Sequence, residues 1–167
     1  AVGVGRAPEA HPHGLCRRRP PPACQASGRA GRLATMRIAT HNVNGIRAAQ
    51  RRGFSSWLEA RHPDVIALQE VRCPVESLPA EAFGPYHVTY DPGTLAGRNG
   101  VAVLTRRPPV AVRGWDATVF GWSPGREVGL VEPAVDFRLA RELRHFAGEG
   151  RYLEVDLADA PVTVASV

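Results

Sequence analysis

The sequence predicts one α/β domain over residues 36–167, preceded by a disordered tail over residues 1–35 that is rich in arginine and proline. Three observations lead to this prediction. The chain has 167 residues, which is about the length of a single domain. Its apolar content of 44% is sufficient for a sizeable core. From residue 36 onward, short apolar segments typical of strands alternate with helical patterns, as they do in α/β folds.

The tail has neither helical nor strand periodicity, and it contains five prolines and five glycines. Ordering it would cost about 1–2 kcal/mol per residue in backbone entropy, which its few large apolar side chains do not offset. We therefore predict disorder, with an arginine-rich transit peptide as the alternative. The single methionine is Met36, where the regular patterns begin, and we predict that the natural protein starts there.

The strongly basic composition belongs to the tail. All 21 basic residues are arginines, against 16 acidic residues. Six of these arginines and one of the acids lie in residues 1–35, which leaves 15 of each sign in residues 36–167. The domain is therefore neutral, and its net charge alone does not indicate a nucleic-acid partner. An odd number of cysteines and the lack of an apolar run of about 20 residues favour a cytoplasmic protein with no membrane contact.

The first elements of the domain are a strand and a short helix. Residues 37–43 (RIATHNV) form a strand candidate that Asn44-Gly45, a strong turn signal, brings to an end. Over residues 53–62, apolar residues at positions i, i+3 and i+4 predict an amphipathic helix. These residues are Phe54, Trp57 and Leu58. The His62-Pro63 pair ends this helix, because the residue before a proline avoids the helical region.

Three strands follow. The strand candidate at residues 64–68 (DVIAL) consists, after its aspartate, of a continuous apolar run that is rich in β-branched residues, as expected of a strand buried on both faces. Residues 86–91 and 100–105 are two further strand candidates, and the first of them leads into a turn at Asp91-Pro92-Gly93.

The last elements are a helix and two strands. The spacing of Leu139, Leu143 and Phe146 predicts a helix over residues 136–147, which Gly148 and Gly150 end. Residues 151–157 alternate like a half-exposed strand, and residues 162–167 begin another. Because the chain stops inside an apolar strand, we expect it to be a truncated piece of a longer domain.

Two polar residues lie at the carboxyl ends of predicted strands. Asn42 lies at the carboxyl end of the first strand, and Glu70 lies at the carboxyl end of the strand at residues 64–68. Ligands bind outside the carboxyl ends of the strands in open α/β sheets, so these side chains converge if the two strands are neighbours. Both offer hard oxygen atoms, which suit Mg²⁺. The alternative is that both are ordinary solvated or turn-forming residues.

Basic residues surround this candidate site. Three arginines occupy the short segment after the Asn-Gly turn, namely Arg47, Arg51 and Arg52. Beside a hard-metal site, such a cluster suits a phosphate backbone. The loop of Arg98, Asn99 and Gly100 offers a similar possibility, because a glycine lets backbone amides approach a phosphate closely. The alternative for both segments is a solvated surface loop.

Four segments occur in the order, and at about the spacing, of a known protein family. They are IATHNVNGIRA (38–48), DVIALQEVR (64–72), GRNGVAVLTR (97–106) and GRYLEVDL (150–157). The chain resembles the exonuclease III / apurinic–apyrimidinic endonuclease family, within the endonuclease/exonuclease/phosphatase superfamily. The resemblance covers about the first half of a typical member. It implies the N-terminal part of a four-layer α/β/β/α sandwich with mixed sheets.

The resemblance also implies roles for particular residues. Asn42 matches the asparagine that helps to organise the metal and the scissile phosphate, and Glu70 matches the principal magnesium ligand. These two are therefore the expected catalytic and metal-binding residues. Arg47, Ala48 and Arg52 match positions that meet the DNA backbone.

Three further positions are expected to bind DNA. Arg72 stands where many family members carry a lysine just past the glutamate. Arg98 and Asn99 match a loop that touches the strand opposite the lesion.

The implied function is that of a DNA repair nuclease that depends on Mg²⁺, with Mn²⁺ as a possible substitute. It would act as a monomer, near the bacterial nucleoid, on double-stranded DNA with abasic sites or 3′ ends. Further catalytic motifs of the family come after the position that corresponds to Val167, so we expect this chain to be inactive or nearly so alone. The alternatives are another phosphohydrolase of the same superfamily, or a non-catalytic fragment that binds DNA or takes part in assembly.

Overall fold

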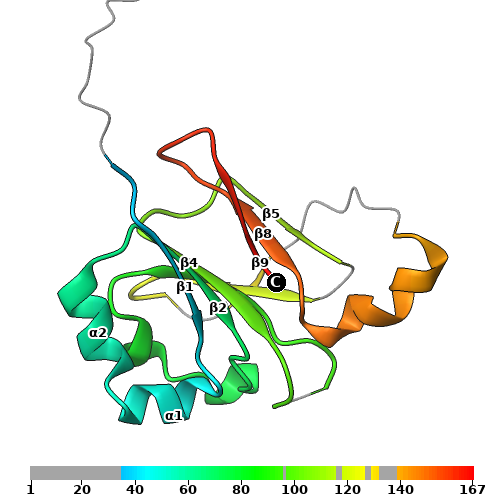
Figure 1. The fold of residues 1–167 in the computed structure, drawn as a ribbon, viewed down its shortest axis with the longest axis horizontal. Coiled ribbons are helices and arrows are strands. Elements are labelled where there is room, and N and C mark those ends of the chain that lie inside the picture. The colour runs from blue at the N-terminus through cyan, green and yellow to red at the C-terminus, as the bar shows by residue number, and fades with distance from the viewer. Residues whose placement is uncertain (1–34, 96, 116–117, 127–128, 132–138) are drawn as a thin grey trace, which may run out of the picture. The chain divides into compact units, whose positions relative to one another are not determined.

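The computed structural model describes residues 35–95, 97–115, 118–126, 129–131 and 139–167, and Figure 1 shows the arrangement of their elements. Residues Thr35–Val167 form one unit of the chain. No helix in the described ranges is long and apolar enough to cross a membrane. The predicted tail, apart from its last residue, lies outside these ranges.

A six-stranded mixed sheet is the centre of the fold. In spatial order its strands are β1 (Ile38–Asn42), β2 (Val65–Gln69), β4 (Val101–Thr105), β3 (His87–Asp91), β6 (Val119–Trp122) and β7 (Gly129–Val131). Strands β1 and β2 are parallel, whereas β4 is antiparallel both to β2 and to β3. Strands β1, β2 and β3 therefore run in the same direction, and their carboxyl ends meet at one edge of the sheet.

A smaller antiparallel sheet packs on one face of the large one. Its strands, in spatial order, are β5 (Ala111–Gly114), β8 (Leu153–Asp156) and β9 (Thr163–Ser166). Strand β9 is tied to β2 by the Ser166 hydroxyl, which donates to the Leu68 carbonyl at 2.8 Å. This bond places the end of β9 next to the end of β2.

Helices cover the opposite face of the large sheet (Figure 1). They are α1 (Ile46–Arg51), α2 (Phe54–Arg61) and the short 3₁₀ helices η1 (Val75–Ser77) and η2 (Ala80–Phe83). The two α-helices bury apolar residues spaced three or four positions apart in the same core cluster as the sheet residues Ile66, Leu68 and Leu104. The other face of the same strands packs against the small sheet through a second cluster that includes Val65, Val103 and Leu153. The described part thus shows a helix layer and two packed sheets, as expected of the N-terminal part of the sandwich.

Most predicted elements are confirmed. The strands predicted at residues 37–43, 64–68, 86–91, 100–105, 151–157 and 162–167 correspond to β1, β2, β3, β4, β8 and β9, and the helix predicted at 53–62 corresponds to α2. Strand β2 is buried on both faces, as predicted from its continuous apolar run. Strands β5, β6 and β7, of three or four residues each, are too short to show a period in the sequence.

Two segments differ from the sequence-based interpretation. The alternative of a solvated loop for the segment of Arg47, Arg51 and Arg52 does not hold, because most of this segment forms α1, whose Ile46 and Ala49 are buried at positions i and i+3. Six residues are too few for a helical period to be recognised.

The helix predicted at residues 136–147 also differs. Residues 136–138 lie outside the described ranges, and Arg141–Glu149 forms a 3₁₀ helix, η3, rather than an α-helix. Leu143 and Phe146 are 40% and 37% exposed, so the predicted apolar stripe does not pack into either core cluster. Gly150 ends this helix, as predicted, and is left-handed, whereas Gly148, which was also expected to end it, lies within η3.

Candidate metal and nucleic-acid site

The ends of β1 and β2 bring the two predicted metal-binding residues to one edge of the sheet. The parallel register places Asn42 opposite Gln69, the residue that precedes Glu70. Beyond the strands, the Val43 amide donates to the Gln69 carbonyl at 3.0 Å, and the Gly45 amide donates to the Glu70 carbonyl at 2.8 Å. The backbone segments that carry the two side chains are therefore fixed side by side. Asn42 is exposed and Glu70 is half-buried.

The backbone at this edge is strained. Four non-glycine residues in the described part of the chain have a positive φ, and three of them lie here: Asn44 at +45°, Glu70 at +52° and Arg72 at +48°. Left-handed conformations cost roughly 1–2 kcal/mol for residues with a side chain. Such strain persists only where the surrounding structure fixes it, and it is concentrated at functional sites.

Backbone hydrogen bonds from both sides hold the strained segment. The Ile46 amide donates to the Val71 carbonyl at 2.9 Å, the Val71 amide donates to the Gly100 carbonyl at 3.0 Å, and the Arg72 amide donates to the Asn99 carbonyl at 2.8 Å. The segment after β2 is thus bound both to the start of α1 and to the loop before β4.

The Arg72 guanidinium bridges two side chains of the site. Its Nη2 lies 2.7 Å from Glu70 Oε2, and its Nη1 donates to Asn44 Oδ1 at 2.7 Å. The side chains of Arg72 and Glu70 are 40% and 37% exposed, so this ion pair lies at the surface.

The oxygen donors fit a hard cation that is held partly by water and phosphate. Asn42 Oδ1 accepts one hydrogen bond, from the Asn44 amide at 3.1 Å, which leaves a second lone pair. Glu70 contributes a carboxylate that solvent can reach. Mg²⁺ commonly binds one or two protein carboxylates and keeps several waters. No group of three or more His, Cys, Asp or Glu side chains that could hold a metal occurs among the residues that the structure describes.

The predicted DNA-binding residues lie around this edge and differ in their exposure and in their hydrogen bonds. Arg47 is exposed on α1, next to the half-buried Ala48. The Arg52 guanidinium donates to the Val43 carbonyl at 3.1 Å, so it also ties the end of α1 to the end of β1. Arg98 is exposed, whereas Asn99 is half-buried and its carbonyl accepts the Arg72 amide.

A glycine is required at position 100, because the backbone there passes close to the Tyr90 side chain. The φ of Gly100 is +99°, and a Cβ atom there would lie 2.8 Å from the Tyr90 hydroxyl oxygen. That hydroxyl donates to the Cys73 carbonyl at 2.7 Å, just past the strained segment. Burial raises the pKa of Tyr90 above its ordinary value, so the hydroxyl stays protonated and able to donate. Burial also raises the pKa of the Cys73 thiol, against the opposing effect of Arg47.

Asp91 is a residue at this edge that sequence reasoning missed. It ends β3, which runs parallel to β2, and it is only 1% exposed. Its Oδ1 accepts the Gly93 amide at 2.8 Å, but its Oδ2 has no hydrogen-bond partner among the described residues. Burial raises the pKa of this carboxyl to about 6. The Asp-Pro-Gly sequence indicated only a turn and gave no sign that the carboxyl would be buried.

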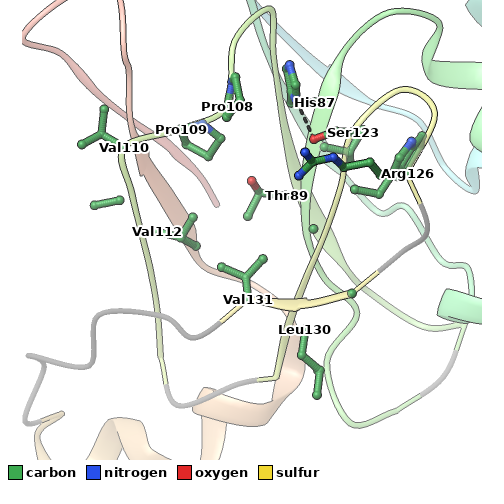
Figure 2. Close-up of a pocket in the computed structure, with 15 residues that line it drawn as sticks. His87, Thr89, Pro108, Pro109, Val110, Val112, Ser123, Arg126, Leu130 and Val131 are labelled. Carbon is green, nitrogen blue, oxygen red and sulfur yellow. Dashed lines mark hydrogen bonds between the residues drawn. The ribbon is translucent and has the colours of Figure 1, made fainter.

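A pocket of about 400 Å³ lies toward the other end of β3, lined by residues of both sheets (Figure 2). There His87 Nδ1 and the Ser123 hydroxyl are hydrogen-bonded at 2.7 Å, and the Arg126 side chain lies beside them. Burial, followed by the positive charge of Arg126, lowers the pKa of His87. None of the predicted site residues lines this pocket.

Comparison with known proteins agrees with this arrangement. Residues 39–161 match the model of the endonuclease/exonuclease/phosphatase family. The chain belongs to this family. The resemblance noted in the sequence is thereby confirmed, and the matched range includes every predicted site residue.

Individual family relatives are similar over part of their length. The chain is 36% identical over 86 residues to the DNA repair nuclease APEX1 of Danio rerio, which is 49% of this chain and 28% of that protein. It is 36% identical over 81 residues to exodeoxyribonuclease III of Haemophilus influenzae, which is 47% of this chain and 29% of that protein. The chain thus spans less than a third of these curated relatives.

Solved structures of the family share the fold. An AP endonuclease from Archaeoglobus fulgidus is similar with a TM-score of 0.52 and 25% identity, over 77% of this chain and 40% of that one. The catalytic domain of Xenopus laevis APE2 is similar with a TM-score of 0.50 and 28% identity, over 72% of this chain and 38% of that one.

Proposed function

We propose that this chain is part of a metal-dependent nuclease that hydrolyses phosphodiester bonds of double-stranded DNA at abasic sites or 3′ ends. The observation that carries the proposal is the register of β1 and β2, which brings Asn42 and Glu70 to one edge in a chain of this family. The names of similar proteins support the choice of substrate, since they include a DNA repair nuclease and an exodeoxyribonuclease.

Asn42 and Glu70 are the residues that would hold the metal, with Mg²⁺ as the preferred ion and Mn²⁺ as a substitute. The Glu70 carboxylate supplies the negative charge, and the Asn42 amide oxygen supplies a neutral ligand whose orientation the Asn44 amide fixes. Stabilisation of charge on the phosphate and the leaving oxygen is the chemistry that such an ion supplies when bound.

The DNA backbone would be held by the basic residues around the edge. Arg47 and Ala48 on α1 lie on one side, and Arg98 and Asn99 lie in the loop before β4. Arginine and backbone amides suit this task, because contacts to phosphates fix the position of the duplex without reading its sequence. Arg52 would act partly through its bond to the Val43 carbonyl, which fixes α1 relative to Asn42.

We expect the chain alone to have little or no nuclease activity. We also expect it to be a monomer, with a domain that starts near residue 36. One carboxylate and one amide do not activate a water molecule, and loss of an essential catalytic group typically costs about 10³–10⁶ in rate. An assay of abasic-site cleavage with Mg²⁺ tests this expectation. Turnover near that of Haemophilus influenzae exodeoxyribonuclease III would contradict it.

A binding titration tests the DNA contacts separately from catalysis. We expect the affinity for a duplex with an abasic-site analogue to fall with salt, by a slope of about −0.9 for each phosphate contact. Arg47→Gln should reduce this slope by about 1. Arg61→Gln, which removes the same charge from the far end of α2, should leave it unchanged. A flat salt dependence in the unaltered chain would exclude phosphate contacts and with them the proposed substrate.

A further inference from the structure

The Arg72 guanidinium contacts both Glu70 and Asn44, and these contacts bear on the affinity of the site for a metal ion. We propose that Arg72 is a built-in counter-ion that competes with a divalent cation for the Glu70 carboxylate, so that the site exchanges one cation for the other. The inference rests on the proposed function, because it takes Glu70 as a metal ligand. It assigns to Arg72 a control of metal affinity that is separate from contact with DNA.

The contact places a positive charge at the ligand atom itself. The Nη2 atom lies 2.7 Å from Glu70 Oε2, which is the distance of a strong charge-assisted hydrogen bond. A metal ion on the same oxygen would stand within a few ångströms of the guanidinium. A unit charge and a divalent cation about 4 Å apart repel each other enough, even in water, to change an equilibrium constant about thirtyfold.

The backbone that carries the Arg72–Glu70 pair has an unusual conformation and is held in place by hydrogen bonds. Both Glu70 and Arg72 have a left-handed φ, and the amide of Arg72 is bound to the Asn99 carbonyl. Asn44, which accepts a hydrogen bond from the same guanidinium, is left-handed as well. Three residues with a positive φ therefore meet at this guanidinium. An exposed glutamate needs no such arrangement, because water satisfies its oxygens.

The pair is nevertheless weak enough to open. Both side chains are more than a third exposed, and ion pairs of this kind contribute little to stability because water and salt screen them. A cation that gains Glu70, Asn42 and a substrate phosphate can therefore displace the guanidinium. By contrast, the neighbouring Arg52 is directed to a backbone carbonyl, so it does not compete for Glu70 in this way.

The affinity for Mn²⁺ alone, measured in the absence of DNA by the electron paramagnetic resonance signal of the free ion, tests the proposal on the full 167-residue chain. Arg72→Gln removes the charge but keeps an amide that can bond to Asn44, and we expect it to bind Mn²⁺ about tenfold more tightly. Arg72→Lys keeps the charge but cannot reach both partners, and we expect a smaller gain. Arg61→Gln, with the same loss of charge at the end of α2, should change the affinity less than twofold.

The possible results separate this inference from the proposed function. If the unaltered chain binds Mn²⁺ and Glu70→Gln abolishes binding, while neither variant at position 72 binds more tightly, then Arg72 is not a competitor and the metal site stands. If neither the unaltered chain nor Arg72→Gln binds Mn²⁺, both ideas are overturned. Increasing salt should narrow the difference between Arg72→Gln and the unaltered chain, because it screens the repulsion.

Discussion

The two ends of strand β3 contain polar groups of different kinds. Asp91, at the carboxyl end, is buried, and one of its oxygens has no partner in the part of the chain that the structure describes; it lies at the edge where the strained residues after β1 and β2 also meet. His87, at the other end, is half-buried, bonded to a hydroxyl, and open to a pocket whose described lining includes no non-glycine residue with a positive φ. A five-residue strand separates the two ends by roughly 13 Å.

This difference indicates which end of β3 contains the features that lower the stability of the fold. At the carboxyl-end edge, left-handed backbone, a close approach at Gly100 and a buried carboxyl each cost stability, and hydrogen bonds from three segments hold them in place. At the pocket end Gly121 also lies in a close approach, since a Cβ there would lie 2.5 Å from the Val131 side chain, but the described lining has no left-handed residue with a side chain, and His87 is bonded to Ser123. Because strain that the surrounding structure maintains is characteristic of functional sites, the comparison favours the carboxyl-end edge as the place of chemistry.

Substitution of a glycine at each end of β3 should give the largest difference in unfolding free energy. Gly100→Ala combines a positive φ with a Cβ 2.8 Å from the Tyr90 hydroxyl, so we expect a loss of about 3 kcal/mol in unfolding free energy. Gly125→Ala, near the pocket, has a φ of +77° but open space around the Cβ, and should cost about 1 kcal/mol. Urea denaturation of both variants measures the difference. Equal losses would show that the approach to Tyr90 is not tight.

The pH dependence of stability should differ in sign between the two ends. The pKa of Asp91 is raised from 3.8 to about 6, so its contribution is complete below pH 3.8 and is lost as the pH rises through 6. The loss amounts to about 3 kcal/mol across this range. Asp91→Asn, which cannot ionise, should remove most of this slope in denaturation experiments between pH 4 and 7. A slope that Asp91→Asn leaves unchanged would place the titrating group elsewhere.

His87 should act in the opposite direction. Its pKa is lowered by burial and by Arg126, so its contribution is present above pH 6.5 and is lost as the pH falls below that value. His87→Gln should remove this part of the acid sensitivity and leave the Asp91 part in place. The same denaturation series, extended to the double variant, measures whether the two effects are independent.

The smallest expected effect is electrostatic. Arg126→Gln removes the charge beside His87 and should raise the pKa of the imidazole toward its ordinary value, with little change in stability. The chemical shift of the His87 ring, followed against pH by NMR, measures it. An unchanged or lower pKa would mean that Arg126 does not face His87 in solution.

Much of this fold could be predicted from sequence, because strands such as β2 and β4 are continuous apolar runs and α2 has a clear helical period. The carboxyl-end edge was predicted only in part. Asn42 ends β1 and Glu70 follows β2, and a position at the end of a strand is a signal that a sequence shows. The left-handed conformation of Glu70 and the burial of Asp91 depend on packing between distant segments, and no local pattern encodes them.

The claim on which the account depends is that Asn42 and Glu70 hold one divalent cation. Paramagnetic broadening by Mn²⁺ of the side-chain amide signals of ¹⁵N-labelled asparagine tests this claim most directly. The account predicts that substoichiometric Mn²⁺ broadens the Asn42 amide strongly and that Glu70→Gln abolishes the effect. Sharp Asn42 signals in the presence of bound Mn²⁺, or equal broadening in Glu70→Gln, would contradict it.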